Sequence, residues 1–162
     1  MSFYFMTEVA MSEHYVQLVP VDAHFIPGLA AQQAVVALLR ELWPQVGEID
    51  CEVAEQVVYR DCGENFERVG CPHCGAELDI AAWHALMDAD YCEQSGGFAL
   101  ASQTLPCCAA VATVNELDYA WPQAFSRFAV IAQAPGGLLE PALLTQLEAL
   151  LGCPLRVVYR MC

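Results

Sequence analysis

The chain has 162 residues, and its 20 acidic side chains against six arginines and no lysine give a formal net charge of −14. Hydrophobic residues make up 57% of it and charged residues 16%, which excludes a disordered acidic tail. Contacts to nucleic-acid phosphates or anionic lipids require clustered Lys and Arg, so a chain with this charge is not expected to bind either. With no apolar run near the roughly 18–20 residues of a membrane span and no signal-peptide pattern, we expect a cytoplasmic protein with neither nucleic acid nor membrane as its partner.

The first part of the chain predicts a leader, a strand and a helix. Residues 1–10 have no clear hydrophobic period, so we expect a flexible leader before a single domain over 11–162. Residues 15–20 are typical of a strand that ends at a proline. Pro27 is suited to the first position of a helix, which continues at helical spacing until Pro44.

The middle of the chain predicts a strand over 49–60 and then an insertion over about 61–110, which begins at the turn Asp61-Cys62-Gly63. Asp79 is suited to cap a helix, and Gly96-Gly97 to end it. The predicted buried stripe of this helix is Ile80, Trp83, Met87 and Tyr91. A further strand is expected over 98–104.

The last third predicts a second strand–helix–strand unit. We expect a strand over 125–133, a loop at Pro135-Gly136-Gly137, a helix over 141–151 closed by Gly152, and a strand over 155–161. The order is therefore β-α-β, insertion, β-α-β. Two such halves can pair as one antiparallel sheet with both helices on one face, so we predict an α+β fold with a ferredoxin-like split βαβ sheet and a zinc-binding β/α insertion.

Nine cysteines include two pairs, Cys71 and Cys74 in Cys71-Pro72-His73-Cys74-Gly75, and the adjacent Cys107 and Cys108 after Pro106. An odd number without a secretion signal argues against a disulfide framework. Structural zinc takes four tetrahedral ligands, commonly four thiolates, so we predict Zn²⁺ held by these four cysteines. Adjacent cysteines in a straight strand point to opposite faces, so both bind only if the backbone turns there.

Two alternatives concern the ligands and the chemistry of these cysteines. Cys62 or His73 is an alternative fourth ligand. Cys71-Pro72-His73-Cys74 is also the active-site sequence of strongly oxidising thioredoxin-like oxidoreductases, in which the first thiolate lies at a helix N-terminus. Here the helix cap comes only at Asp79. A thiol-disulfide oxidoreductase, or a metal hydrolase with an incomplete thiolate shell, using Cys71 and Cys74 is therefore the alternative function.

No other motif points to catalysis. The sequence has no phosphate-binding glycine loop, no His-Glu-x-x-His and no dinucleotide fingerprint. A zinc ion with four thiolate ligands leaves no position open for water, so it is structural. We therefore expect a protein that is not an enzyme.

The acidic residues are concentrated in the middle of the chain. Residues 41–93 contain 13 acids and two arginines, a net of −11, whereas residues 119–162 contain two acids and three arginines, a net of +1. Such a segment serves solubility, and it also matches the pattern that attracts a cationic partner. The predicted partner-binding residues are Glu48, Asp50, Glu52, Glu55, Asp61, Glu64 and Glu67, with Phe66 as an exposed aromatic anchor.

The cysteine motifs, followed by Asn115-Glu116-Leu117-Asp118-Tyr119 and Trp121-Pro122, resemble a family of small bacterial zinc-ribbon-like proteins of unassigned function. The resemblance runs from about Tyr15 to the C-terminus. The family pattern reads Cys-Pro-x-Cys-Gly, Pro-Cys-Cys-Gly and Tyr-Asp-Trp-Pro-x-Gly-Phe, and here Ala109, Ala120 and Ala124 replace Gly, Asp and Gly. It implies a metal role for the four paired cysteines and no activity.

Together these features favour a non-enzymatic acidic module that binds a basic protein. Immunity-type inhibitors, which neutralise cationic bacterial toxins, are small and acidic, and they capture their targets through charge. The most specific expectation is therefore an immunity-type inhibitor of a basic toxin such as a nuclease, stabilised by a structural zinc site.

Overall fold

The computed structural model describes residues 13–133 and 137–162, in which it has three α-helices and four antiparallel sheets. The predicted leader, and Pro135 and Gly136 of the predicted loop, lie outside the described residues. None of the helices in the described ranges combines the length and the apolar character needed to cross a membrane.

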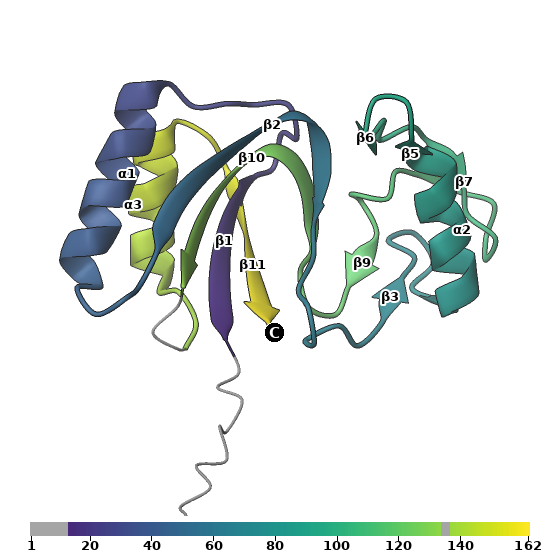
Figure 1. Cartoon of the computed structure of the whole chain (residues 1–162). Coiled ribbons are helices and arrows are strands. Elements are labelled where there is room, and N and C mark those ends of the chain that lie inside the picture. Colours follow the sequence, from purple (N-terminus) through teal and green to yellow (C-terminus); the bar gives the residue numbers. More distant parts are fainter. Residues whose placement is uncertain (1–12, 134–136) are drawn as a thin grey trace, which may run out of the picture.

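The main sheet has four strands in the order β11-β1-β10-β2, and all neighbours are antiparallel. Its strands are β1 (His14–Pro20), β2 (Ile49–Arg60), β10 (Ala124–Gln133) and β11 (Leu155–Met161). Helices α1 (Leu29–Leu42) and α3 (Pro141–Leu151) cover one face of it (Figure 1). The predicted mixed α+β class is confirmed.

The apolar periodicity of both helices explains this packing. Val35 and Leu39 of α1 and Leu147 and Leu151 of α3 are buried in one cluster with Phe128 and other side chains of the sheet. Helix α3 has its proline in the first turn, and Gly152 ends it with a φ of 77°, as predicted. Helix α1 differs from the prediction, because Gly28 is its cap residue and Pro27 therefore lies before the helix.

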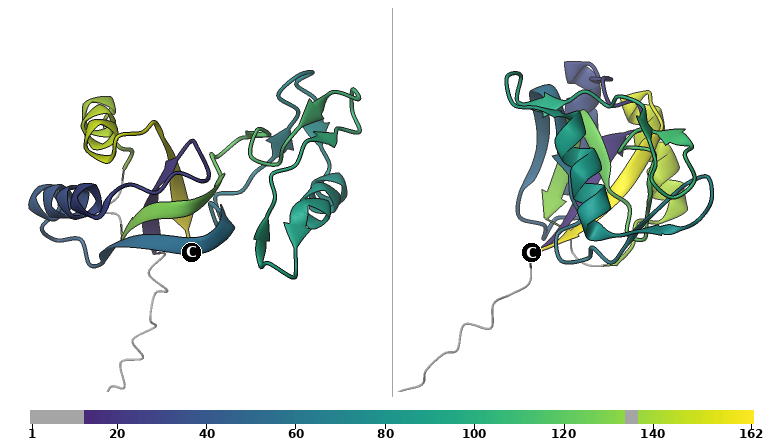
Figure 2. Two further views of the ribbon diagram at one scale, coloured as in Figure 1. Left: turned by 90° about the horizontal axis from the view of Figure 1, so that it is seen from above. Right: turned by 90° about the vertical axis from the view of Figure 1, so that its right-hand side faces the viewer.

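The segment between β2 and β10 forms a separate layer on the side of the sheet opposite α1 and α3 (Figure 2). It contains helix α2 (Ile80–Asp90) and two-residue strands, of which β9, near its end, pairs with β3. The strands are β3 (Val69–Gly70), β4 (Glu77–Leu78), β5 (Tyr91–Cys92), β6 (Gly97–Phe98), β7 (Gln103–Thr104), β8 (Val111–Ala112) and β9 (Asp118–Tyr119). They form the sheets β4-β3-β9, β5-β6 and β7-β8.

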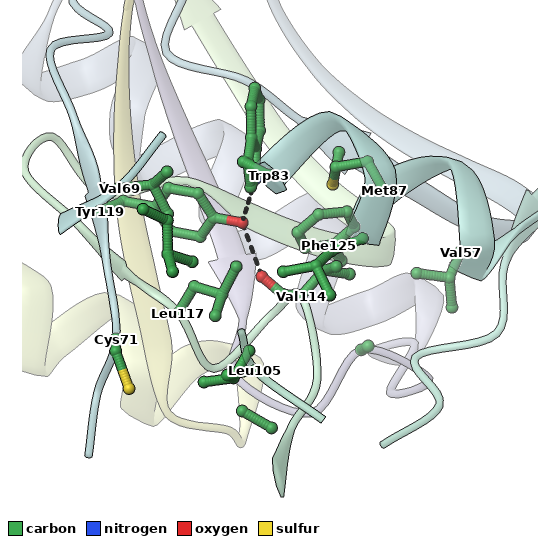
Figure 3. Close-up of a cluster of buried hydrophobic side chains, with 14 residues drawn as sticks. Val57, Val69, Cys71, Trp83, Met87, Leu105, Val114, Leu117, Tyr119 and Phe125 are labelled. Carbon is green, nitrogen blue, oxygen red and sulfur yellow. Dashed lines mark hydrogen bonds between the residues drawn. The ribbon is translucent and has the colours of Figure 1, made fainter. Parts of the chain in front are cut away.

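A second apolar cluster joins this layer to the sheet (Figure 3). Phe125 of β10 is fully buried in it beside Trp83 of α2. The Trp83 indole N–H donates to the Tyr119 hydroxyl at 3.3 Å, and that hydroxyl donates to the Val114 carbonyl at 2.6 Å. Burial raises the pKa of Tyr119 to about 12, so the phenol keeps the proton that this bond requires.

Helix α2 follows the prediction at its start and departs from it afterwards. The Asp79 carboxylate accepts the Ala82 N–H at 2.7 Å, which confirms the cap. Trp83 and Met87 are buried, but the other two residues of the predicted stripe, Ile80 and Tyr91, are 46% and 42% exposed. The predicted stripe is wrong at both ends, because only the middle turns of this short helix face the cluster.

A buried carboxylate ends α2 earlier than predicted. Asp90 is 4% exposed and accepts the N–H groups of Leu100 and Ala101, both at 2.8 Å. These bonds hold Leu100 at a φ of 54°. The helix therefore ends before the two glycines: Gly96 lies in the β5–β6 turn and Gly97 begins β6. The predicted strand over 98–104 is divided between β6 and β7.

A buried arginine supports an irregularity in the pairing of β10 with β2. The register with β2 shifts between Ser126 and Phe128, and such bulges leave backbone groups without ladder partners. Arg60 of β2 is 4% exposed, and its guanidinium donates to the Ser126 hydroxyl at 3.2 Å and to the Arg127 carbonyl at 3.4 Å. Its charge is paired with Glu52 at 2.5 Å, as a buried guanidinium requires.

Candidate metal centre

The first cysteine pair lies in a tight turn directly after β3. The Gly75 N–H donates to the Cys71 carbonyl at 3.0 Å, and the Cys71 N–H donates to the Ala76 carbonyl at 2.8 Å. Gly75 has a φ of 75°, the left-handed conformation that glycine adopts at little cost. The turn brings the sulfur atoms of Cys71 and Cys74 within 4.8 Å of each other.

The second cysteine pair lies in a turn with the same hydrogen bonds. The Ala109 N–H donates to the Leu105 carbonyl at 3.0 Å, and the Leu105 N–H donates to the Ala110 carbonyl at 2.8 Å. Leu105 therefore takes the place that Cys71 has in the first turn, and a proline follows in both. By the same correspondence Cys108 matches Cys74. The backbone turn that adjacent cysteines need in order to share an ion is present.

Both turns are anchored in the cluster around Trp83. Cys71 and Leu105, the first residues of the two turns, are each 1% exposed and belong to that cluster (Figure 3). The His73 ring links the turns as well, because its Nε2 lies 3.0 Å from the carbonyl oxygen of Val111 in β8. The apolar packing thus fixes the two turns against each other.

The four sulfur atoms converge at one point. The Sγ atoms of Cys71 and Cys108 are 3.7 Å apart, those of Cys74 and Cys107 are 3.5 Å apart, and all four lie within 4.8 Å of one another. Four thiolates around a tetrahedral zinc, each at about 2.3 Å, would be separated by about 3.8 Å. All nine cysteines are free thiols. The cluster could hold a metal ion.

The two alternative ligands do not belong to this cluster. Cys62 is fully buried in another apolar cluster, beside Val19 and Val158, and its pKa is raised to about 11 by that burial. The His73 ring is engaged with Val111, as described above.

The surroundings lower the pKa of the Cys71 thiol and raise that of the Cys107 thiol. The N–H groups of Cys74 and His73 lie 3.4 and 3.3 Å from the Cys71 sulfur and lower its pKa to about 6. Desolvation, together with the neighbouring sulfurs, raises the pKa of Cys107 to about 12. At neutral pH Cys71 is thus ionised and Cys107 keeps its proton, so metal binding must release protons.

Replacing Ala109 by glycine is expected to stabilise the second turn. Ala109 has a φ of 60°, where an L-residue with a Cβ is strained and glycine is not. We expect the free energy of unfolding to rise by about 0.5–1 kcal/mol, measured by urea denaturation of the metal-loaded protein. Ala110→Gly is the matched control, because Ala110 is not among the positive-φ residues, and it should lower stability. A loss of stability in both variants would contradict the strain at Ala109.

The cluster does not have the position of a thioredoxin-like redox site. In those enzymes the first cysteine lies at a helix N-terminus, where the helix dipole stabilises its thiolate. Here Cys71 follows the short strand β3, and β4 separates it from α2. The low pKa of Cys71 comes from N–H groups of its own turn, which are the donors that support a metal-bound sulfur.

The predicted partner-binding acids fall into two groups at opposite ends of β2. Glu48, Asp50, Glu52 and Glu55 are exposed along its first half and just before it. Asp61, Glu64 and Glu67 follow its last residue. In this second group the Asp61 carboxylate is paired with Arg160 at 3.2 Å, and Glu67 accepts the Trp121 indole N–H at 3.3 Å.

Phe66 is not an exposed anchor. Its ring is half-buried and stacks on Trp83, with centroids 5.1 Å apart. The sequence placed it among turn charges and thus suggested exposure, whereas the indole of α2 covers it. Leu105 was missed as a structural counterpart of Cys71, because the two share no side-chain chemistry and only the proline after each signals the match.

Comparison with protein-family models, with curated proteins and with solved structures finds no match for this chain. The resemblance to zinc-ribbon-like proteins therefore stays a prediction. What the protein does must be inferred from its own residues, above all from the four converging cysteines and the distribution of its acids.

Proposed function

We propose that the four cysteines hold a structural Zn²⁺ ion. The donor set supports this assignment, because four thiolates in tetrahedral positions are typical of zinc and, less often, of iron. Four protein ligands fill the coordination shell, so no water can be activated on the ion. The metal's role is then to hold two hairpin turns together in a layer that has only two-residue strands.

We also propose that the main sheet is of the ferredoxin-like type and that the chain belongs with the small zinc-ribbon-like proteins. The first assignment is supported by two β-α-β halves and by the strand order β11-β1-β10-β2. The second is supported by the pair of matching turns at Cys71 and Leu105. Neither assignment adds an activity.

We infer that the protein is a non-catalytic module that binds a basic protein in the cytoplasm. The observation that carries this inference is the group of acids on β2. Among the described residues the ion pairs are Arg60–Glu52 and Arg160–Asp61. Glu48, Asp50 and Glu55 are exposed carboxylates that form no ion pair with an arginine in the described part of the chain. Unpaired charge of one sign attracts a partner of the other sign.

The most specific form of the proposal is an immunity-type inhibitor of a basic bacterial toxin such as a nuclease. It is tested by producing the basic product of a neighbouring gene with and without this protein. We expect the protein to restore growth and to form a complex with the toxin. Asp50→Lys combined with Glu55→Lys should weaken the complex by about tenfold or more, because attraction becomes repulsion.

The matched control for charge is Asp88→Lys combined with Glu77→Lys, which changes the net charge equally in the insertion. If both double variants weakened the complex equally, binding would depend on the overall charge of the protein and not on the acids of β2. If no basic protein bound, and the purified protein reduced disulfides by itself with Cys71, the proposal would be replaced by the oxidoreductase.

A further inference from the structure

The first half of β2 is an open edge of the main sheet. Strand β2 is the last strand in the order, with β10 as its neighbour, and it runs along the outside of the sheet in Figure 2. Its second half is covered by β6. The Gly97 backbone of β6 is so close to β2 that a Cβ added there would lie only 2.4 Å from the Gln56 Cβ and 3.0 Å from the Val57 carbonyl oxygen. The open part is therefore the segment from Ile49 to about Glu55.

The hydrogen-bond pattern shows which backbone groups point outwards there. The Gln133 N–H donates to the Glu48 carbonyl at 3.0 Å. Because antiparallel ladders alternate, Asp50 and Glu52 also bond to β10, and the residues between them point to the open edge. The Ile49 carbonyl follows this pattern, because it points away from β10 and accepts a hydrogen bond from the Arg40 guanidinium at 3.4 Å. The N–H and C=O groups of Cys51 and Val53 are thus placed to pair with another strand.

An apolar groove lies beside this edge on the helix side. It has a volume of about 390 Å³ and is lined by Cys51 and by residues of α1, namely Leu29, Gln32, Gln33, Val36, Ala37 and, at one end of this stretch of the helix, Arg40. Leu29 is 69% exposed and Val53 is 52% exposed. Cys51 and Val53 lie opposite Val130 and Phe128, which pack under the helices, so their side chains share the face that the groove occupies.

The other face of the same edge is acidic. Asp50 and Glu52 lie opposite Ile131 and Ala129, whose side chains are on the face away from the helices. Successive residues of an added strand would alternate between the two faces. One set would cover the apolar groove, and the other would lie beside the carboxylates of Asp50 and Glu52.

We propose that this edge binds an extended segment of the basic partner as a fifth strand, with apolar residues over the groove and Lys or Arg beside the acids. The inference rests on the proposed function and adds the binding mode to it. A second copy of this chain is a poorer occupant, because pairing β2 with β2 would bring its acids together across the interface. Strand addition joins backbone hydrogen bonds to side-chain selection, which suits such an edge.

The test uses a fluorescent peptide of about nine residues that alternates Lys and Val, measured by anisotropy with the metal-loaded protein at low salt. We expect binding, and we expect a Glu–Val peptide not to bind. Two further peptides carry N-methyl groups on all valines or on all lysines. Successive N–H groups of a strand point to opposite edges, so only one of these two should lose affinity, by about tenfold or more.

Protein variants then locate the binding site. Ala37→Trp fills the groove from an exposed position, and Ala34→Trp is its matched control on the same helix outside the groove. We expect Ala37→Trp to weaken peptide binding by about tenfold and Ala34→Trp to change it by less than about twofold. Asp50→Asn should weaken binding more than Asp88→Asn, the control on α2. Glu52 is left intact because it pairs with the buried Arg60.

Several results would overturn strand addition at this edge. They are absence of peptide binding up to about 1 mM, equal losses from both methylated peptides or from neither, and equal effects of the two tryptophans. If the protein formed a dimer and Ala37→Trp dissociated it, the occupant of this edge would be a second copy of the chain. If a basic protein partner bound and Ala37→Trp did not change its affinity, the proposed function would stand and strand addition at this edge would be wrong. If the peptide bound as expected but no basic protein partner did, the edge would bind extended basic segments and the proposed function would be wrong.

Discussion

Replacing Cys74 by serine is expected to remove the metal and to destabilise the protein by more than about 3 kcal/mol. Serine is a poor zinc ligand, and the free energy of metal binding contributes to folding. For a chain of this size the loss corresponds to a fall in Tm of about 6–12 °C. Cys74 is the suitable position because it is exposed, so the exchange leaves no cavity, whereas Cys71 also belongs to the apolar cluster.

The matched control for Cys74→Ser is Cys92→Ser. Cys92 is also exposed, but it lies in the β5–β6 hairpin outside the four-cysteine cluster. Thermal unfolding followed by circular dichroism, together with the metal content of each variant, separates the two. Cys92→Ser should keep the metal and the Tm. Equal Tm values for Cys74→Ser and the original protein would contradict a metal that stabilises the fold.

Replacing Phe125 by alanine is expected to lower the free energy of unfolding by about 3–5 kcal/mol. The side chain is fully buried, and its ring lies 5.1 Å from that of Tyr59 and 5.0 Å from that of Phe98, centroid to centroid. These contacts join β10 of the main sheet to β6 of the other layer. The variant should therefore loosen the metal-binding layer as well as lower overall stability, as measured by urea denaturation and by amide hydrogen exchange.

Phe128→Ala is the control for this second effect. Phe128 is equally buried, but in the cluster under α1 and α3. Phe128→Ala should therefore lower stability by a similar amount without a specific increase in amide hydrogen exchange in α2 and β9. If the two variants gave the same exchange pattern, the two clusters would not be separate units. If Phe125→Ala changed stability by less than about 1 kcal/mol, the packing described for Phe125 would be wrong.

The elements with strong local signals were predictable from the sequence. Helix α3 has proline at its start and glycine at its end, and both its bounds and those of β11 agree with the prediction. Asp79 fixes the start of α2 in the same way. In each case the decisive chemistry lies within a few residues of the element itself, so no tertiary contact is needed to locate it.

The end of α2 was not predictable, because it depends on distant groups. In the sequence Asp90 resembles an exposed charged residue of a helix. Only in the folded chain does its carboxylate accept the N–H groups of Leu100 and Ala101. Phe66 was misjudged for the same reason, since its cover comes from Trp83. Local patterns contain no information on such contacts.

The candidate site was predictable in its ligands and not in its geometry. Cysteine spacing predicted the four residues that converge. The equivalence of the turns at Cys71 and Leu105 depends on backbone hydrogen bonds, and the groove beside β2 depends on where α1 lies against the sheet. The predicted partner-binding acids were adjacent in the sequence, but the structure places them in two groups at opposite ends of β2, and each group contains one ion pair with an arginine.

The metal content of the protein purified without added chelator tests the four-cysteine site most directly. Elemental analysis by mass spectrometry, combined with titration of accessible thiols, gives the metal and the state of the cysteines in one sample. We predict about one zinc ion per chain, and release of Cys71, Cys74, Cys107 and Cys108 to the thiol reagent only after chelation. A protein without metal, in which Cys71 and Cys74 are joined by a disulfide, would contradict the structural zinc site.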